Sequence, residues 1–293
     1  MERNYLVPSE ICNEAVEAGI KKASIKTPTL LLLSIMAGMF IALAAEGSNM
    51  AVHKLAASDF GLGKALAGVL FTTGLMLVVV AGGELFTGNS LMTAALLERR
   101  ISLGSVIRNW VLVYAGNFVG SLLIAWMIVS SGQFNASEGG LGGYTIKVAA
   151  SKCGLNFSQA LILGILCNVL VCLAVWMSYS AKDITGKLFA MFFPIFLFVT
   201  SGFEHSVANM YYIPAGIMAA ANPKWLEMSG VSAQKLANLN WTSFITNNLI
   251  PVTLGNIIGG GLLVAAVYWL VYRRNSIRAV SSNQSNNTVN KSL

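Results

Sequence analysis

The chain has 293 residues, of which 55% are hydrophobic and only 11% are charged, and its mean hydropathy is +0.67. Soluble globular domains carry about 25% charged residues, so this composition excludes a disordered chain, a disulfide scaffold and an ordinary soluble enzyme. It predicts an integral membrane protein, in which the formal net charge of +7 bears on orientation rather than on nucleic-acid binding.

The first segment, residues 1–27, is too polar to cross a membrane and contains no apolar core typical of a cleavable signal peptide. Within it, residues 9–24 mix apolar and charged positions as an amphipathic helix does. We expect this helix to lie along the cytoplasmic surface of the membrane.

Residues 28–274 form the predicted transmembrane domain. The longest of several uncharged runs, between Lys235 and Arg273, holds 37 residues, and a spanning helix needs about 20. Such continuous runs favour helices over barrel strands, which would alternate. The predicted spans, six in number, are residues 28–48, 64–97, 106–131, 158–181, 187–220 and 244–272.

The distribution of lysine and arginine predicts the orientation. With the N-terminus in the cytoplasm, 13 basic residues fall on the inner side and 6 on the outer side. Both termini are therefore expected to face the cytoplasm, with the protein in the cytoplasmic (inner) membrane. The polar tail, residues 275–293, is of low complexity and is predicted to be disordered.

Two groups of spans repeat one another. Spans three and six share an Asn, Gly-Asn, Gly pattern at one spacing, which begins at Asn109 and at Asn248. Spans one and four match weakly, Gly38 against Gly164. Because each copy has three spans, the second copy must cross the membrane in the opposite sense, so we predict an inverted repeat of about residues 28–131 and 158–272. Such repeats place the functional site at the midplane between the halves.

Spans two and five are too long for one straight helix, and each has a polar interruption. Glu84 precedes Asn89 by five residues, and Glu204 precedes Asn209 by the same spacing. Non-helical backbone at membrane depth is tolerated where it is buried in protein or lines a cavity. We expect these four residues to support the broken helices, with the carboxylates bonding the unwound backbone. His205, beside the second break, is a candidate titratable group in a pore.

Four motifs resemble the formate/nitrite transporter family, and the resemblance runs from the amphipathic segment to about Arg274. The motifs are GGELFTGN at 82–89, CNVLVCLAVWMS at 167–178, SGFEHSVANM at 201–210 and NLIPVTLGN at 248–256. The resemblance implies an aquaporin-like all-α fold and a homopentamer with one pore in each protomer. It also implies passage of formate, nitrite or hydrosulfide, often together with protons, across the lipid bilayer.

The resemblance also implies roles for particular residues. His205 matches the central pore histidine, Thr87 the threonine that hydrogen-bonds it, Lys152 the vestibule lysine and Asn168 an asparagine near the pore centre. Leu85 and Phe86 match the cytoplasmic constriction, and Phe71, Leu75 and Phe198 match the outer one. The i, i+4 spacing of Phe71 and Leu75 puts both on one helix face, which suits an apolar ring.

An apolar ring opposes a bare anion, because an unpaired buried ion costs several kcal/mol. Protonating a carboxylate of pKa about 4 at pH 7 costs about 4 kcal/mol. Protonating the anion of a weak acid is therefore the cheaper route than dehydrating the bare anion. The hypothesis is that Lys152 and Asn168 draw the anion inward and that His205, or water it organises, supplies or relays a proton. Formate is the leading substrate, with hydrosulfide and nitrite as alternatives.

Other classes are less well supported by the residues. A water or glycerol channel would carry paired Asn-Pro-Ala turns, whereas Asn222-Pro223 is followed by Lys224. A membrane-embedded enzyme would need a nucleophile with a base, or metal ligands, at membrane depth. A receptor or a purely structural pentamer is a further alternative. The sequence predicts a protein that is not an enzyme, with no cofactor, no metal site and no nucleic-acid partner.

Overall fold

A computed structural model of the chain describes residues 3–274, so the predicted tail lies outside the described residues. The first half contains a surface helix, two long spans and a broken span between them. Its elements are α1 (Pro8–Ser24), α2 (Thr27–Val52), α3 (Leu55–Ser58), α4 (Phe60–Met76) with a π-helical end (Leu77–Gly82), a 3-10 turn (Gly88–Met92), α5 (Thr93–Leu97) and α6 (Leu103–Ser130).

The second half repeats this order and ends in a long helix with π-helical parts. Its elements are a 3-10 segment (Gln133–Gly139), α7 (Gly140–Cys153), α8 (Phe157–Ser180), α9 (Ile184–Thr200), α10 (Ser206–Ala219), α11 (Pro223–Ser229), α12 (Ala233–Ala237), α13 (Trp241–Ser243), a π-helical turn (Phe244–Leu249), α14 (Ile250–Ile257), a π-helical segment (Ile258–Ala266) and α15 (Val267–Tyr272).

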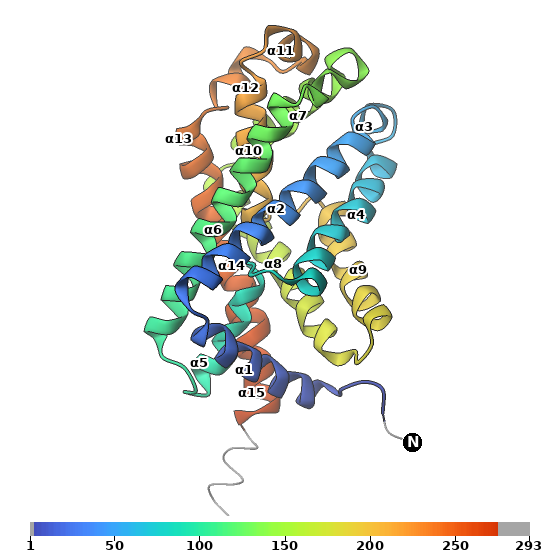
Figure 1. The fold of residues 1–293 in the computed structure, drawn as a ribbon. Coiled ribbons are helices and arrows are strands. Elements are labelled where there is room, and N and C mark those ends of the chain that lie inside the picture. The colour runs from blue at the N-terminus through green and yellow to red at the C-terminus, as the bar shows by residue number, and fades with distance from the viewer. Residues whose placement is uncertain (1–2, 275–293) are drawn as a thin grey trace, which may run out of the picture.

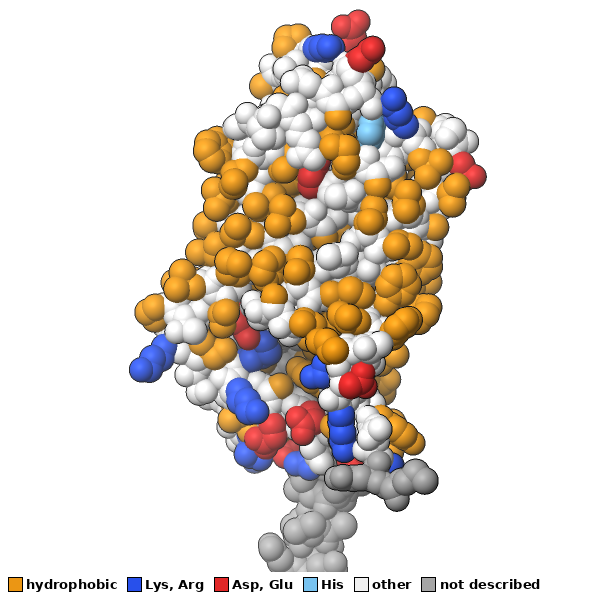
Figure 2. Space-filling view, turned by 45° about the vertical axis from the view of Figure 1, so that its right-hand side comes forward, with side chains coloured by type: hydrophobic (Ala, Val, Ile, Leu, Met, Phe, Trp, Pro, Cys, Tyr) orange, Lys and Arg blue, Asp and Glu red, His pale blue; other side chains and the backbone are white. Residues whose placement is uncertain are grey.

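The described chain is all-helical and suited to a membrane. Five of the described helices are long and apolar enough to cross a bilayer, and α9 is a shorter apolar helix. In Figure 1, α1 and α15 lie at one end of the molecule, and α3, α7 and α11 lie at the other. Figure 2 shows a broad hydrophobic belt between these ends, with most charged side chains near them. The predicted all-α membrane class is confirmed, whereas the arrangement of six spans as two inverted repeats stays a prediction.

Both predicted interruptions are present. The first break lies between the π-helical end of α4 and the turn at Gly88, and the second between α9 and α10. Each begins with a glycine in the left-handed region, Gly82 at φ +98° and Gly202 at φ +72°. A side chain is strained in this conformation, so glycine is required where the helix stops.

Spans one and four pack closely on spans three and six. A Cβ added to Gly116 would collide with the Ser34 side chain, and one added to Gly255 would collide with the backbone carbonyl of Leu161. Small residues allow this approach of two backbones in a membrane protein. This close packing at the glycines brings asparagines on α6 and α14 within reach of the broken helices.

Candidate functional site

The two broken helices meet at a pair of buried polar side chains. Thr87 ends the first break, His205 ends the second, and the Thr87 Oγ1 lies 2.8 Å from the His205 Nε2. Both residues are buried, with 0% and 3% of their surface exposed. The contact that the resemblance implied is therefore present in the structure.

The local backbone fixes the tautomer of His205. This residue is the N-cap of α10, and its Nδ1 accepts a hydrogen bond from the Ala208 backbone N–H at 3.0 Å. A nitrogen that accepts a hydrogen bond carries no proton, so the neutral ring is protonated at Nε2 and donates to Thr87. A second ring proton would need Nδ1 and would break the cap. The positive end of the α10 dipole also disfavours an imidazolium here.

Asn168 on α8 ties the two halves together. Its Nδ2 lies 3.2 Å from the Thr87 carbonyl oxygen, 2.6 Å from that of Asn256 and 3.3 Å from the Ser90 Oγ. Its Oδ1 has no hydrogen-bond partner among the residues the structure describes. These contacts hold the loop that carries Thr87, while the expectation that Asn168 draws an anion inward stays a prediction.

The unwound backbone of the first break is bonded by Asn117 on α6. Its Nδ2 donates to the carbonyl oxygens of Glu84 (2.9 Å) and Ser34 (2.7 Å), and its Oδ1 accepts from the Phe86 N–H at 2.9 Å. One buried side chain thus bonds two backbone groups that the broken helix leaves free, and it ties them to a carbonyl of α2.

Asn256 on α14 does the same for the second break. Its Nδ2 donates to the carbonyl oxygens of Glu204 (3.1 Å) and Gly164 (2.8 Å), and its Oδ1 accepts from the Ser206 N–H at 3.0 Å. Ser34 in the first half therefore corresponds to Gly164 in the second half. The predicted match of Gly38 with Gly164 was wrong by one helical turn. The physical reason is that the residue with the accepting carbonyl, not the nearest glycine, fixes the register.

The carboxylate of Glu84 bonds side chains rather than backbone. It accepts from the Lys22 Nζ at 2.7 Å and from the Asn89 Nδ2 at 2.7 Å. Asn89 also donates to the Asn109 Oδ1 at 2.8 Å, and the Asn109 Nδ2 donates to the Lys22 carbonyl oxygen at 3.2 Å. A buried carboxylate needs a countercharge, so Glu84 pairs with Lys22. The backbone of the break is bonded by the Asn117 amide instead.

Glu204 has an equivalent set of partners. It accepts from the Lys152 Nζ at 2.8 Å and from the Asn209 Nδ2 at 2.6 Å. Asn209 donates to the Asn248 Oδ1 at 2.7 Å, and the Asn248 Nδ2 donates to the Lys152 carbonyl oxygen at 3.1 Å. The expectation that the two carboxylates bond the unwound backbone was thus wrong, although all four predicted residues lie at the breaks.

Four asparagines and a lysine of these clusters were missed as site residues. Asn109, Asn117, Asn248 and Asn256 were recognised only as positions of the repeat, and Lys22 was not singled out. The equal spacing of Lys22 to Ser34 and Lys152 to Gly164, 12 residues in each case, was the available signal. This equal spacing extends the correspondence between the halves to α1 and α7, the helices that precede α2 and α8.

The predicted apolar constrictions are buried but lie in different places. Leu85 and Phe86 lie on the first break, where Phe86 packs on Tyr114 at 4.9 Å between ring centroids. The Phe71 and Phe198 rings meet edge-on at 5.6 Å, and Phe198 lies 5.9 Å from the His205 ring. Leu75 is buried one turn along α4 from Phe71.

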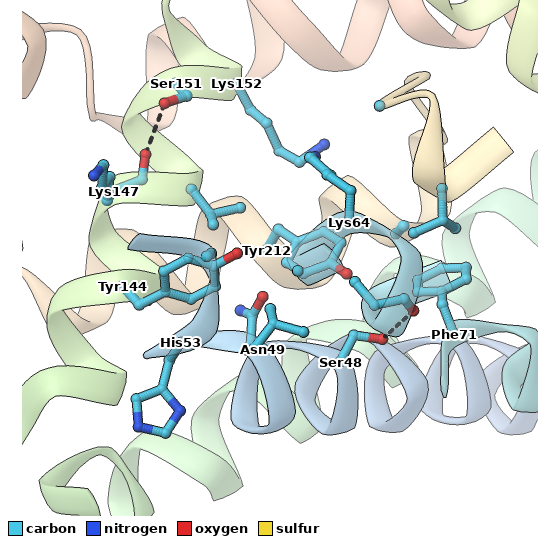
Figure 3. A pocket seen from close by; sticks show the side chains of 18 of the residues that line it. Ser48, Asn49, His53, Lys64, Phe71, Tyr144, Lys147, Ser151, Lys152 and Tyr212 are labelled. Carbon is cyan, nitrogen blue, oxygen red and sulfur yellow. Dashed lines mark hydrogen bonds between the residues drawn. The ribbon is translucent and has the colours of Figure 1, made fainter. Parts of the chain in front are cut away.

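A cavity of about 800 Å³ lies toward the end of the molecule where α3 and α7 lie, and its lining includes His205. Figure 3 shows other lining side chains, among them Phe71, Lys152 and Tyr212. Of the predicted residues, the cavity is lined by Phe71, Lys152, Phe198, Glu204, His205 and Asn209. The others, among them Thr87, Asn168 and Leu85, lie outside its lining. The Lys152 Nζ lies 5.3 Å from the centre of the Tyr212 ring, which is a favourable position for a cation.

Comparison with known proteins gives a consistent family. The family model described as formate/nitrite transporter matches residues 9–270. The formate channel FocA of Escherichia coli (strain K12) is 42% identical over 273 residues, which are 92% of this chain and 96% of that protein. The FocA of Haemophilus influenzae is 45% identical over 262 residues, covering 88% of this chain and 92% of the relative.

A solved structure described as a pentameric formate channel with formate bound has a similar fold. The TM-score is 0.75 at 40% sequence identity, and the superposition covers 84% of this chain and 97% of that chain. The stretch matched by the family model, residues 9–270, includes both broken helices and the helices that carry the asparagines.

Proposed function

The chain belongs to the formate/nitrite transporter family, and we propose that it is a channel that carries formate and related small monovalent weak-acid anions across the cytoplasmic membrane. One observation carries the proposal: a buried, neutral His205, bonded to Thr87, lies at the inner end of a lysine-lined cavity and next to the Phe71–Phe198 pair. This combination offers an anion attraction, hydrogen-bond donors and an apolar barrier in sequence.

We further propose that the protein forms a homopentamer with a pore in each protomer. Its similarity to a pentameric formate channel supports this assembly. Both termini then face the cytoplasm, as the distribution of 13 against 6 basic residues favours. The cavity would open on the outer side.

Passage past the aromatic pair would require neutralisation of the anion. The proton would come from the outer solution and be relayed by water in the cavity rather than by the imidazole, because the Nδ1 of His205 is occupied by the Ala208 N–H. The Nε2–H of His205 and the Thr87 hydroxyl would orient the carboxylate and this water. The anion and a proton thus leave the outer solution together and arrive together inside.

Flux into proteoliposomes tests the proposal. We would offer formate, nitrite, hydrosulfide, lactate and chloride in turn, with a pH-sensitive dye inside. Formate uptake with acidification of the interior and little chloride current is the expected result. A large chloride current without a pH change would mean that the anion crosses in charged form, and the proton-coupled mechanism would be abandoned. The relative rates also decide between formate, hydrosulfide and nitrite.

A further inference from the structure

Lys152 does not offer a free charge to an incoming anion. Its ammonium is hydrogen-bonded to the Glu204 carboxylate at 2.8 Å, and this carboxylate is buried. A contact ion pair has no net charge, so its attraction for a distant anion is weak. The cation that recruits the anion in the outer cavity must therefore be sought elsewhere.

Three further lysines line the cavity, and Lys64 differs from the other two. Lys54 and Lys147 are exposed to solvent, whereas Lys64 on α4 is half-buried. No salt bridge or hydrogen bond of the Lys64 ammonium is found among the residues the structure describes. Its Nζ lies 5.6 Å from the centre of the Phe60 ring, a cation–π contact that adds no negative countercharge. A partly desolvated ammonium attracts an anion more strongly than an exposed one.

Lys64 is also placed next to the second break. Its Nζ lies 3.7 Å from the position that a Cβ on Gly202 would take, at the turn that leads into Glu204 and His205. It is close enough to feel the charges of both Lys152 and Glu204. Figure 3 shows the side chains of Lys64 and Lys152 extending toward the same part of the cavity.

We propose that Lys64 is the residue that binds the permeating anion first, in a site that it forms with the outer side of the Lys152–Glu204 pair. The local charge of these three residues is +1, which one monovalent carboxylate neutralises. An anion there also screens the repulsion between the two ammonium groups. Phe71 and Phe198 line the same cavity, so the site and the apolar barrier share one space.

The inference rests on the proposed transport of formate, and kinetics on reconstituted variants test it. In Lys64→Met we expect KM for formate to rise about tenfold, the change that about 1.4 kcal/mol of lost binding produces. The maximal rate should stay within about twofold, because uniform binding affects KM alone. Added salt should also slow the variant less than the unmodified protein.

The matched controls keep the test specific. Lys147→Met removes a lysine of the same cavity that is exposed, and it should leave KM and the salt dependence unchanged. Lys64→Arg keeps the charge and should keep a KM near the original. In Lys64→Cys, attachment of an aminoethyl thiol group should restore a low KM, whereas attachment of a methylthio group should not. The native cysteines are buried, and the unmodified protein treated in the same way serves as the reference.

A KM and salt dependence of Lys64→Met equal to those of Lys147→Met would overturn the inference, as would rescue of Lys64→Cys by the neutral methylthio group. If Lys64→Met fails to assemble, the comparison of the two modified forms of Lys64→Cys decides alone. Failure of the proposed function is recognised separately, since the unmodified protein would then show no formate flux at all.

Discussion

The first and second breaks share one hydrogen-bonded scaffold but differ in the residues that the scaffold holds. At each break an asparagine from the third helix of the half bonds the loop, and a lysine from a surface helix neutralises the buried glutamate. After Glu84 the loop continues with Leu85 and Phe86, whereas after Glu204 it continues with His205 and Ser206. The repeat therefore builds two equivalent supports, and the chemistry comes from the residues that break the equivalence.

The difference concerns His205, which lies at the second break where the first break has Leu85. His205 caps α10 through Nδ1, and this leaves Nε2–H directed at Thr87 from the other half. Leu85, at the equivalent position, offers no polar atom. The contact between His205 and Thr87 thus joins the two halves. Transporters built from inverted repeats generally hold their substrate at such a junction.

Removing the histidine should have the largest effect. In His205→Phe we expect proton-coupled formate uptake to fall by at least about a hundredfold, since both the donor to Thr87 and the cap of α10 are lost and a larger apolar ring narrows the passage. The other histidine provides the control: His53 bonds Ser137 near the mouth of the cavity, and His53→Phe should retain most of the flux. Intact uptake by His205→Phe at all pH values would contradict the proposed role.

Truncating the two loop-binding asparagines should separate scaffold from chemistry. Asn117→Ala and Asn256→Ala each remove three bonds to buried backbone groups, and we expect each to destabilise the protein by about 2–4 kcal/mol. Thermal unfolding in detergent should show similar losses for the two variants.

Their effects on transport should differ. Asn256→Ala releases the loop that positions His205 and should lower the formate flux per folded protein more than Asn117→Ala does. Equal loss of flux in the two variants would mean that the first break matters as much for transport as the second. That outcome would contradict the difference between the two breaks described above.

The sequence predicts the supports better than the contacts. The Glu to Asn spacing at both breaks and the Asn, Gly-Asn, Gly pattern of spans three and six are local signals, and the structure places both pairs at corresponding positions. The partners of Glu84 and Glu204 could not be read in this way, because the spacing of a broken helix does not tell which way its carboxylate points. The register of Ser34 against Gly164 was missed since only a carbonyl is shared there, and a carbonyl has no residue signature.

Lys64 was missed for a different reason. A lysine near the start of an apolar span is common, because its stem packs on apolar surface while its ammonium reaches water. Only the placement of Gly202 and of the paired Lys152 beside it distinguishes this lysine from an ordinary one.

The smallest expected effect concerns a clamp on Glu98, for which the described residues of the second half show no counterpart. Arg273, after α15, bonds both carboxylate oxygens of Glu98, which follows α5, and also donates to the Asn13 Oδ1 on α1 at 2.6 Å. Glu98 lies 14 residues after Glu84. The residue 14 positions after Glu204 is Met218, which cannot form such a clamp. These bonds hold the pKa of Glu98 below its ordinary value, chiefly through the hydrogen bonds from Arg273.

A folded-state pKa below the unfolded one contributes stability that is present above the unfolded pKa, near 4.5, and is lost as the pH falls through the folded pKa. We therefore expect Glu98→Gln to be less stable than the unmodified protein at pH 7, by about 1–2 kcal/mol for charge-assisted bonds on a partly buried pair. The difference in melting temperature between the two proteins should shrink as the pH is lowered below about 4.5, where the unfolded carboxyl is protonated. Met218→Gln, the matched change at the corresponding position of the second half, should give a difference in melting temperature that does not vary with pH. A constant difference for Glu98→Gln as well would show that its side chain acts by packing, and that the two ends of the molecule do not differ in their response to acid.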